Sequence, residues 1–328
     1  MITVDYKDIL DAAADMCGLV ATEIDTQDSA ILRRAISRSL EVAWKMEKWP
    51  DLLRCEERYL RDLYAAATAY AAKAEVYYPA EEKHYHALRA STGNLPTNKA
   101  YWAESSTSYS ADDYSAAKAY VAGDKVYYPT EDKFYQCHTA STNNLPTNTS
   151  FWGELVPFVP YVAFEQTGKT KIGTVFGVWD RNPRVFTNAD DVPFELSDVG
   201  VQMLEAVNKV WIEFRSRPPV LKGDVWSSTA AYTVGQQVYF SSNFYDCATN
   251  TSAGESPTTA AAKWTLVEIP HVFKQFLAHA GFAGWLLSDG QNDKVRAELK
   301  TAESLLAMAA DELFRQSGQV RRMTVLTR

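Results

Sequence analysis

The chain contains an aromatic-rich segment that occurs twice in closely similar form and a third time in diverged form. Residues 70–104 recur at 120–154, and about half of the aligned positions are identical. The third copy is marked by Tyr232, Gly235, Val238, Tyr239, Tyr245, Cys247, Pro257 and Trp264. Each copy alternates apolar and polar residues and is broken by turn residues. We therefore predict three small three-stranded β modules, each with a few aromatics as its core and each projecting separately from the rest of the protein.

Helical periodicity is found towards the two ends of the sequence. Residues 5–17 predict a short helix that stops at Gly18, and a longer helix capped by Asp28 or Ser29 is ended by Pro50. Residues 269–316 predict a helical hairpin with its turn at residues 288–290. Its second helix carries an apolar seam of Val295, Leu299, Ala302, Leu306, Ala309 and Leu313. We expect this hairpin to pack on the helix of residues 28–47.

Composition and charge narrow the classes of function. The 328 residues are 46% hydrophobic and 23% charged, as in an ordinary globular protein. No apolar run reaches bilayer length and the first residues are charged, so we expect a protein made in the cytosol with no membrane partner. A net charge of −8 argues against a dedicated nucleic-acid binder, although DNA could still pass such a protein.

Two short motifs invite a chemical interpretation. Residues 163–170 fit the phosphate-loop pattern, but Pro157 and Pro160 interrupt the approach and a β-like segment follows, which favours a hairpin turn. His84 and His86 could face one metal ion from a strand, but no third ligand stands at a diagnostic spacing, and the alternative is a pair of exposed hairpin residues. We find no nucleophile or acid-base signature, so we expect no enzyme, metal or cofactor.

The repeats resemble the chitin-binding type 3 modules of carbohydrate-binding families 5 and 12. The resemblance is carried in the second copy by Tyr120, Gly123, Asp124, Val126, Tyr128, Tyr135, Cys137, Pro146 and Trp152. Those families stack sugar on a tandem tryptophan pair, and this chain has Thr139 and Ala140 there. The resemblance therefore implies that a host surface glycan would stack on other aromatics. The candidates are Tyr77, Tyr101, Trp102, Phe151, Trp152 and Trp264.

The remaining sequence resembles the head-to-tail adaptor of tailed bacteriophages, of the tail-tubular-protein type. The resemblance is carried by Trp49-Pro50, residues 173–180 with Pro183, residues 210–219 and Ile269-Pro270. The resemblance implies a structural virion protein at the head-tail junction that forms a homo-oligomeric ring, a dodecamer, under the portal protein. A tail, nozzle or stopper protein would follow it, and DNA would cross the channel without specific binding. The alternative is a bacterial carbohydrate-binding or enzyme-accessory protein.

The C-terminal residues 319–328 combine apolar and basic side chains but are too short for a core of their own. We predict a portal-docking arm formed by Arg321, Arg322, Met323, Val325, Leu326 and Arg328, and the alternative is a free tail.

Together these observations predict an α+β fold with a helical-bundle adaptor core, a small β segment and three small inserted all-β modules. The predicted parts are core helices at 1–64, β repeats at 65–105, 114–155 and 226–267, a core β segment at 156–225, and the hairpin with its arm at 268–328.

Overall fold

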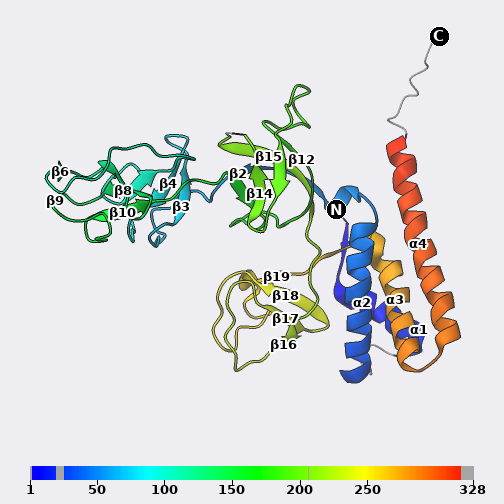
Figure 1. Cartoon of the computed structure of the whole chain (residues 1–328). Coiled ribbons are helices and arrows are strands. Elements are labelled where there is room, and N and C mark those ends of the chain that lie inside the picture. The colour runs from blue at the N-terminus through cyan, green and yellow to red at the C-terminus, as the bar shows by residue number, and fades with distance from the viewer. Residues whose placement is uncertain (1, 20–25, 206, 319–328) are drawn as a thin grey trace, which may run out of the picture. The chain divides into compact units, whose positions relative to one another are not determined.

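The computed structural model describes residues 2–19, 26–205 and 207–318, and the chain divides into two compact units (Figure 1). Unit 1 consists of Met1–Leu53 and Pro218–Arg328, and unit 2 of Arg54–Arg217. The described residues form four α-helices and seven small sheets. The predicted helical-bundle core with only a small β segment is therefore wrong, although the mixed helix and strand content is present. The reason is that the β strands of unit 2 enclose a core of their own and need no helix to cover them.

The helices of unit 1 lie close to their predicted positions. They are α1 (Tyr6–Cys17), α2 (Thr26–Met46), α3 (Lys274–Ser288) and α4 (Asn292–Gly318). Gly18 ends α1 with φ +73°, as predicted, because a residue without a Cβ takes the left-handed conformation freely. The start predicted for α2 is wrong. The helix begins at Thr26, and the Asp28 carboxylate instead accepts a hydrogen bond from the Trp285 indole at 3.2 Å.

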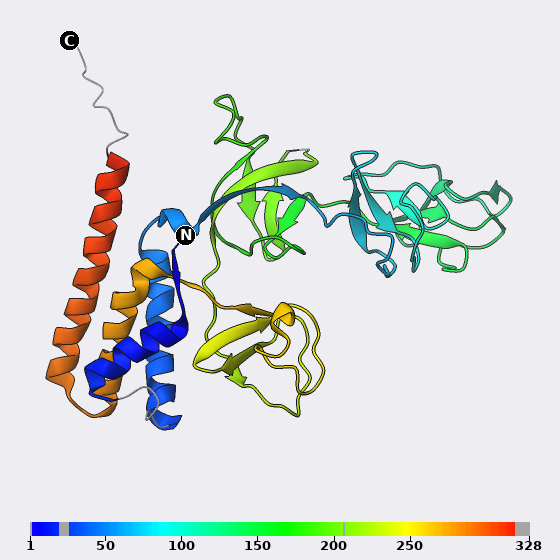
Figure 2. The same cartoon turned by 180° about the vertical axis from the view of Figure 1, so that it is seen from behind.

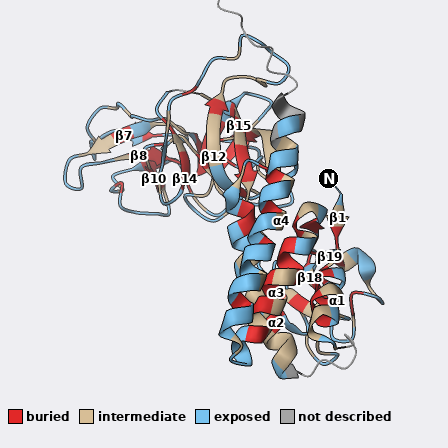
Figure 3. Cartoon of the chain, turned by 90° about the vertical axis from the view of Figure 1, so that its right-hand side faces the viewer, coloured by how far each residue is buried: buried red, intermediate tan, exposed pale blue. Residues whose placement is uncertain are grey.

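Helix α3 is the centre of the helical part, because it packs against α1, α2 and α4. Small residues allow this close approach. A Cβ on Gly284 would lie 2.4 Å from the Ala35 Cβ of α2, and one on Gly281 would lie 3.1 Å from Ile36. Figure 3 shows buried residues along α3 and exposed residues along the outer face of α4. The α3–α4 hairpin predicted from the sequence is thus confirmed.

The predicted apolar seam on α4 is confirmed except at one position. Val295, Ala302 and Leu306 are buried, but Leu299 is 43% exposed. Ala310 is buried instead and joins the core. The seam rotates slightly about the helix, as expected when residues spaced by 3.6 per turn face a single partner helix.

Outside the sheet of the third module, the remaining short elements described in unit 1 are one pair of strands and three 3-10 turns. Strand β1 (Thr3–Val4) pairs with β20 (Ile269–Pro270), and the 3-10 turns are η1 (Pro50–Leu52), η2 (Ala261–Lys263) and η3 (His271–Phe273). The indole of Trp49 meets the ring of Phe273 edge-on at 5.2 Å and donates to the Ala43 carbonyl at 2.8 Å.

The third module belongs to unit 1 and is not a separate projection. Its sheet contains β16 (Asp224–Val225), β17 (Gln237–Phe240), β18 (Asn243–Cys247) and β19 (Trp264–Leu266). The ring of Phe244 meets that of Tyr6 on α1 at 4.9 Å, and the Asn243 amide oxygen accepts the Lys7 backbone N–H at 2.9 Å. The predicted separate projection is therefore wrong for this module, because Phe244 is part of the helical core.

Two small sheets surround the central core of unit 2. One has the order β12 (Ile172–Trp179), β15 (Lys209–Ser216), β2 (Leu53–Tyr59), and the other β11 (Tyr161–Ala163), β14 (Gly200–Met203), β13 (Phe194–Leu196). Their inward side chains, among them Val162, Ile212 and Phe214, form one buried cluster.

The first two modules also lie in unit 2, and each contains the predicted three-stranded sheet. The first contains β3 (Glu75–Tyr78), β4 (Lys83–Ala87) and β5 (Trp102–Glu104). The second contains β7 (Lys125–Tyr128), β8 (Lys133–Cys137) and β10 (Trp152–Leu155), with the pair β6 (Ala119–Tyr120) and β9 (Ser141–Thr142) beside it. The register is shared by all three copies, since Val76, Val126 and Val238 face Tyr85, Tyr135 and Tyr245.

None of the described helices combines the length and hydropathy needed to cross a bilayer.

Candidate ligand-binding clefts between the first two modules

The tryptophans predicted to stack on sugar form the module cores instead. Trp102 and Trp152 are 1% exposed and Trp264 is 7% exposed. Their indole N–H groups donate to the carbonyls of Asn94, Asn144 and Glu255 at 3.0–3.2 Å. A buried indole with its N–H satisfied is the usual state of a core tryptophan. These three side chains therefore offer no open face to a sugar ring.

Tyr101 and Phe151 immediately precede two of these core tryptophans and are half-buried. The guanidinium of Arg89 covers the Tyr101 ring at 4.1 Å from its centroid, and Phe151 packs against the core of the second module. Sequence reasoning did not anticipate that a cation occupies one face of Tyr101.

All three modules dock through the same hairpin face. In the first module Tyr77 stacks on Tyr59 at 4.7 Å and His84 stacks on Phe158 at 4.7 Å. The residue matching His84 in the second module is Phe134, which packs against Tyr109. In the third module it is Phe244, which packs on α1. Tyr77 is 4% exposed, so this face packs against neighbouring residues of the chain and is not accessible to a sugar.

His84 and His86 are buried, so the expectation of exposed hairpin residues is wrong. Burial, with a further contribution from Arg61, lowers the pKa of His84 to about 4. Burial likewise lowers the pKa of His86 to about 4. No cluster of three or more potential metal-ligating side chains occurs among the described residues. Both histidines therefore act as neutral packing residues at neutral pH.

The segment that fits the phosphate-loop pattern joins two strands of different sheets. It follows β11 and leads into strand β12, with Gly168 at φ +70° in the turn. A phosphate loop would need a helix at this exit. The Lys169 ammonium donates to the Glu57 carbonyl and the Thr170 hydroxyl to the Glu56 carboxylate. The phosphate-loop interpretation is therefore wrong. A turn is present, but the predicted hairpin is also wrong, because β11 and β12 belong to different sheets.

The first two modules are neighbours in the fold (Figure 2). They bury a small apolar interface between them. Leu88, Ala103 and Leu155 are buried there, with Tyr109 and Phe134 packed against them. The Gln136 amide of the second module donates to the Trp102 carbonyl of the first at 3.2 Å. The interface therefore fixes the orientation of one module against the other.

A cleft opens on each side of this interface. The first has a volume of about 350 Å³ and the second about 580 Å³. The first module lines the first cleft with Glu81, Tyr85, Pro96, Thr97, Lys99, Trp102, Ala103 and Glu104. The second cleft is lined by the eight residues that follow these by 50 positions: Glu131, Tyr135, Pro146, Thr147, Thr149, Trp152, Gly153 and Glu154. The two clefts are therefore repeat-related.

The opposite wall of each cleft comes from the neighbouring module. Gly123, Lys125 and Gln136 complete the first cleft, and residues including Lys73, Leu88 and Arg89 complete the second. Each cleft is thus a product of two modules.

The polar groups in the clefts are held by matched contacts. The Tyr85 hydroxyl donates to Glu81 at 2.8 Å, and the Tyr135 hydroxyl donates to Glu131. Burial together with the neighbouring carboxylate raises the pKa of both tyrosines. The Lys73 ammonium, 2.7 Å from Glu154, lowers the pKa of that carboxyl. These groups are suited to hydrogen bonding a ligand, and no nucleophile stands beside them.

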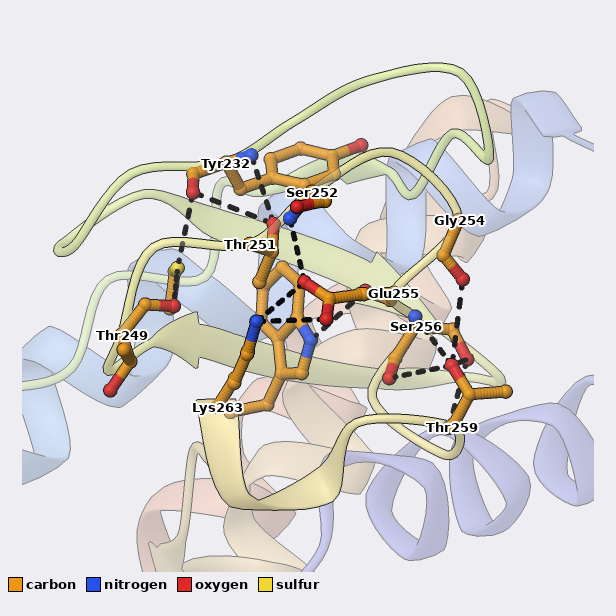
Figure 4. Close-up of polar contacts among 11 residues, drawn as sticks. Tyr232, Thr249, Thr251, Ser252, Gly254, Glu255, Ser256, Thr259 and Lys263 are labelled. Atoms are coloured by element: carbon orange, nitrogen blue, oxygen red, sulfur yellow. Dashed lines mark hydrogen bonds and ion pairs between the residues drawn. The ribbon is translucent and has the colours of Figure 1, made fainter.

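The third module differs from the other two at the hairpin turn that carries the cleft carboxylate. Its hairpin turn is Ser241-Ser242, which is shorter than the turns at 79–82 and 129–132 and carries no counterpart of Glu81 or Glu131. The loop between β18 and β19 is held by hydrogen bonds and an ion pair within the third module (Figure 4). Lys263 pairs with Glu255, whose carboxylate also accepts the Ser252 backbone N–H.

The predicted portal-docking arm, residues 319–328, lies outside the described residues.

In comparisons with known proteins, no protein-family model matches the chain, and no curated protein sequence matches it.

Proposed function

We propose that the protein is a structural, non-enzymatic component of a tailed-phage virion, a head-to-tail adaptor that forms a ring between portal and tail. Unit 1 would supply the assembly surfaces, DNA would pass through the ring, and the first two modules would bind a surface glycan.

One observation carries the adaptor proposal. The four segments that resemble the adaptor family meet in two pairs in the folded chain. Residues 173–180 lie largely in β12 and residues 210–219 largely in β15, and these strands pair directly, with Val178 opposite Ile212. The other two segments meet in the core of unit 1, where Trp49 and Ile269 belong to one buried cluster. Segments distant in sequence thus form one contact in each unit, and we propose that these two contacts are the structural elements shared with the adaptor.

The charge of the chain is compatible with a DNA channel. A net charge of −8 disfavours tight attachment to phosphates, whereas a basic wall would hold the DNA through counterion release.

Mass in solution tests the ring directly. We expect light scattering of the purified chain, or of the chain mixed with portal protein, to give a closed oligomer many times the 36.7 kDa chain mass, with ring-shaped particles in negative stain. A monomer under both conditions contradicts the proposal.

The second candidate is a carbohydrate-binding accessory protein without a virion role, favoured by the paired clefts. It predicts a monomer that retains glycan binding. Both candidates include glycan binding, so ring mass is the readout that separates them.

A further inference from the structure

We propose that the two clefts are equivalent, composite binding sites for an uncharged oligosaccharide segment, and that the third module is not a third site. The inference rests on the glycan-binding part of the proposed function and not on ring formation.

The repeat relation supports equivalence of the two sites. Eight lining positions of one cleft match eight of the other, including the tyrosine, the carboxylate that accepts its hydroxyl, and the Pro-Thr pair. The tyrosine and its carboxylate are held in the same way in both, as Tyr85 with Glu81 and Tyr135 with Glu131. Because six of these eight positions carry the same residue in both clefts, the two sites are expected to select ligands of the same class.

The opposite walls support a composite site. Lys125 and Gln136 face the first cleft from the second module, whereas Lys73 and Arg89 face the second cleft from the first module. A single isolated module would therefore present an open ledge rather than a cleft, and small ligands are bound in concave sites.

Charge balance indicates a neutral ligand. The first cleft is lined by the carboxylates of Glu81 and Glu104 and by the ammonium groups of Lys99 and Lys125. Glu104 is paired with Lys83 at 2.9 Å, and in the second cleft Glu154 lies between Lys73 and Lys133. Because Glu104 and Glu154 are already paired, and because the two carboxylates and two ammonium groups of the first cleft cancel in charge, a charged ligand finds little excess field there. Sugar hydroxyls can both donate to the carboxylates and accept from the lysines.

The third module lacks the carboxylate that both clefts share. Its short turn, Ser241-Ser242, supplies none beside Tyr245. It therefore cannot form the tyrosine–carboxylate pair found in the first two modules.

Three matched threonines provide the test. Thr97, Thr147 and Thr258 each follow the proline of the repeat and are exposed, but only the first two line these clefts. An arginine at these exposed positions should leave folding largely unchanged while filling the cleft beside it. Binding of chitohexaose and cellohexaose to the full chain would be measured by calorimetry and by ligand-observed NMR.

We expect two sites per chain for at least one of these probes, one site in Thr97→Arg, one in Thr147→Arg and none in the double variant. Thr258→Arg should retain two sites. Absence of wild-type binding, a single site, a third site, or loss of binding in Thr258→Arg would overturn the inference. Ring mass measured on the same samples keeps the outcomes apart, since a ring without sites contradicts the clefts alone and sites without a ring contradict the adaptor alone.

Discussion

Gly153 of the second module lies directly against Leu88 of the first, so that a Cβ on the glycine would be 2.6 Å from the Leu88 Cβ. The matching position of the first module is Ala103, which is itself buried in the same interface. Repeat-related positions thus meet the same interface with side chains of different size. The contact shows that the two modules are fitted to each other as a pair.

Gly153→Val is expected to destabilise unit 2 by about 1–3 kcal/mol, because the added methyl groups overpack a filled interface. Urea unfolding followed by tyrosine and tryptophan fluorescence would measure it. Thr92→Val, at an exposed position of the first module, serves as the control and should change little. Equal stability of the two variants would show that the interface is loose.

Phe244→Ala is expected to cost about 3–5 kcal/mol, since it empties a fully buried site between the third module and α1. The repeat-matched variant Phe134→Ala removes a partly buried ring and should cost less. Thermal unfolding of both variants compares them. A smaller loss at Phe244 than at Phe134 would mean that the third module is not anchored through this ring.

Leu306→Asp is expected to destabilise unit 1 by several kcal/mol, on the order of 3 or more, because it buries an unpaired carboxylate. Leu299→Asp, on the same helix but 43% exposed, is the control and should cost under about 1 kcal/mol. Circular dichroism at 222 nm during heating gives both values. Similar melting temperatures for the two variants would place Leu306 outside the core.

Acid is expected to weaken unit 2 through His84. Its pKa is about 4 when folded, below the ordinary 6.5, so the unfolded chain binds the proton more readily. Stability is therefore complete above about pH 6.5 and falls as the pH drops towards 4, by at most about 3 kcal/mol for this one group.

The residue that the second module carries at this position gives the test of acid sensitivity. His84→Phe should reduce the decline in urea midpoint between pH 7 and pH 4.5, leaving the part due to other buried histidines such as His86 and His138. His271→Gln, at an exposed histidine, is the control and should retain the wild-type slope. A wild-type slope in His84→Phe would show that this ring does not titrate on unfolding.

Truncation after Gly318 tests the proposed portal-docking arm. It is expected to leave the melting temperature unchanged, because residues 319–328 are too few to form a core, and to abolish attachment to portal-bearing capsids. Co-sedimentation with capsids measures attachment. Full attachment of the truncated chain would refute a docking role.

Local periodicity was sufficient to predict the helices of unit 1 and the strands of the modules. It could not predict that Tyr6 and Phe244 meet, because nothing in the sequence near either residue specifies a partner so distant in the chain. For the same reason the sequence predicted small β inserts on a helical core, whereas the strands of unit 2 enclose a core of their own.

The tryptophans show where sequence reasoning about the site fell short. A tryptophan at Trp102 suits both a sugar platform and a core, and composition does not separate them. The available signal was internal: all three copies keep this tryptophan, whereas its preceding neighbour is Tyr101, Phe151 or Lys263. The clefts carried no such signal, since their walls come from two modules whose mutual orientation only the folded chain defines.

The division of the chain has a mechanical consequence. Helices α1 and α4 both belong to unit 1, and unit 2 is a single excursion that leaves at Leu53 and returns at Pro218. A pulling load applied between α1 and α4 would be carried first through the contacts around α3, and unit 2 would bear tension only after Leu53 and Pro218 had been drawn apart. Because both clefts lie in unit 2, a load between α1 and α4 would not stretch them while the helices of unit 1 remain packed together.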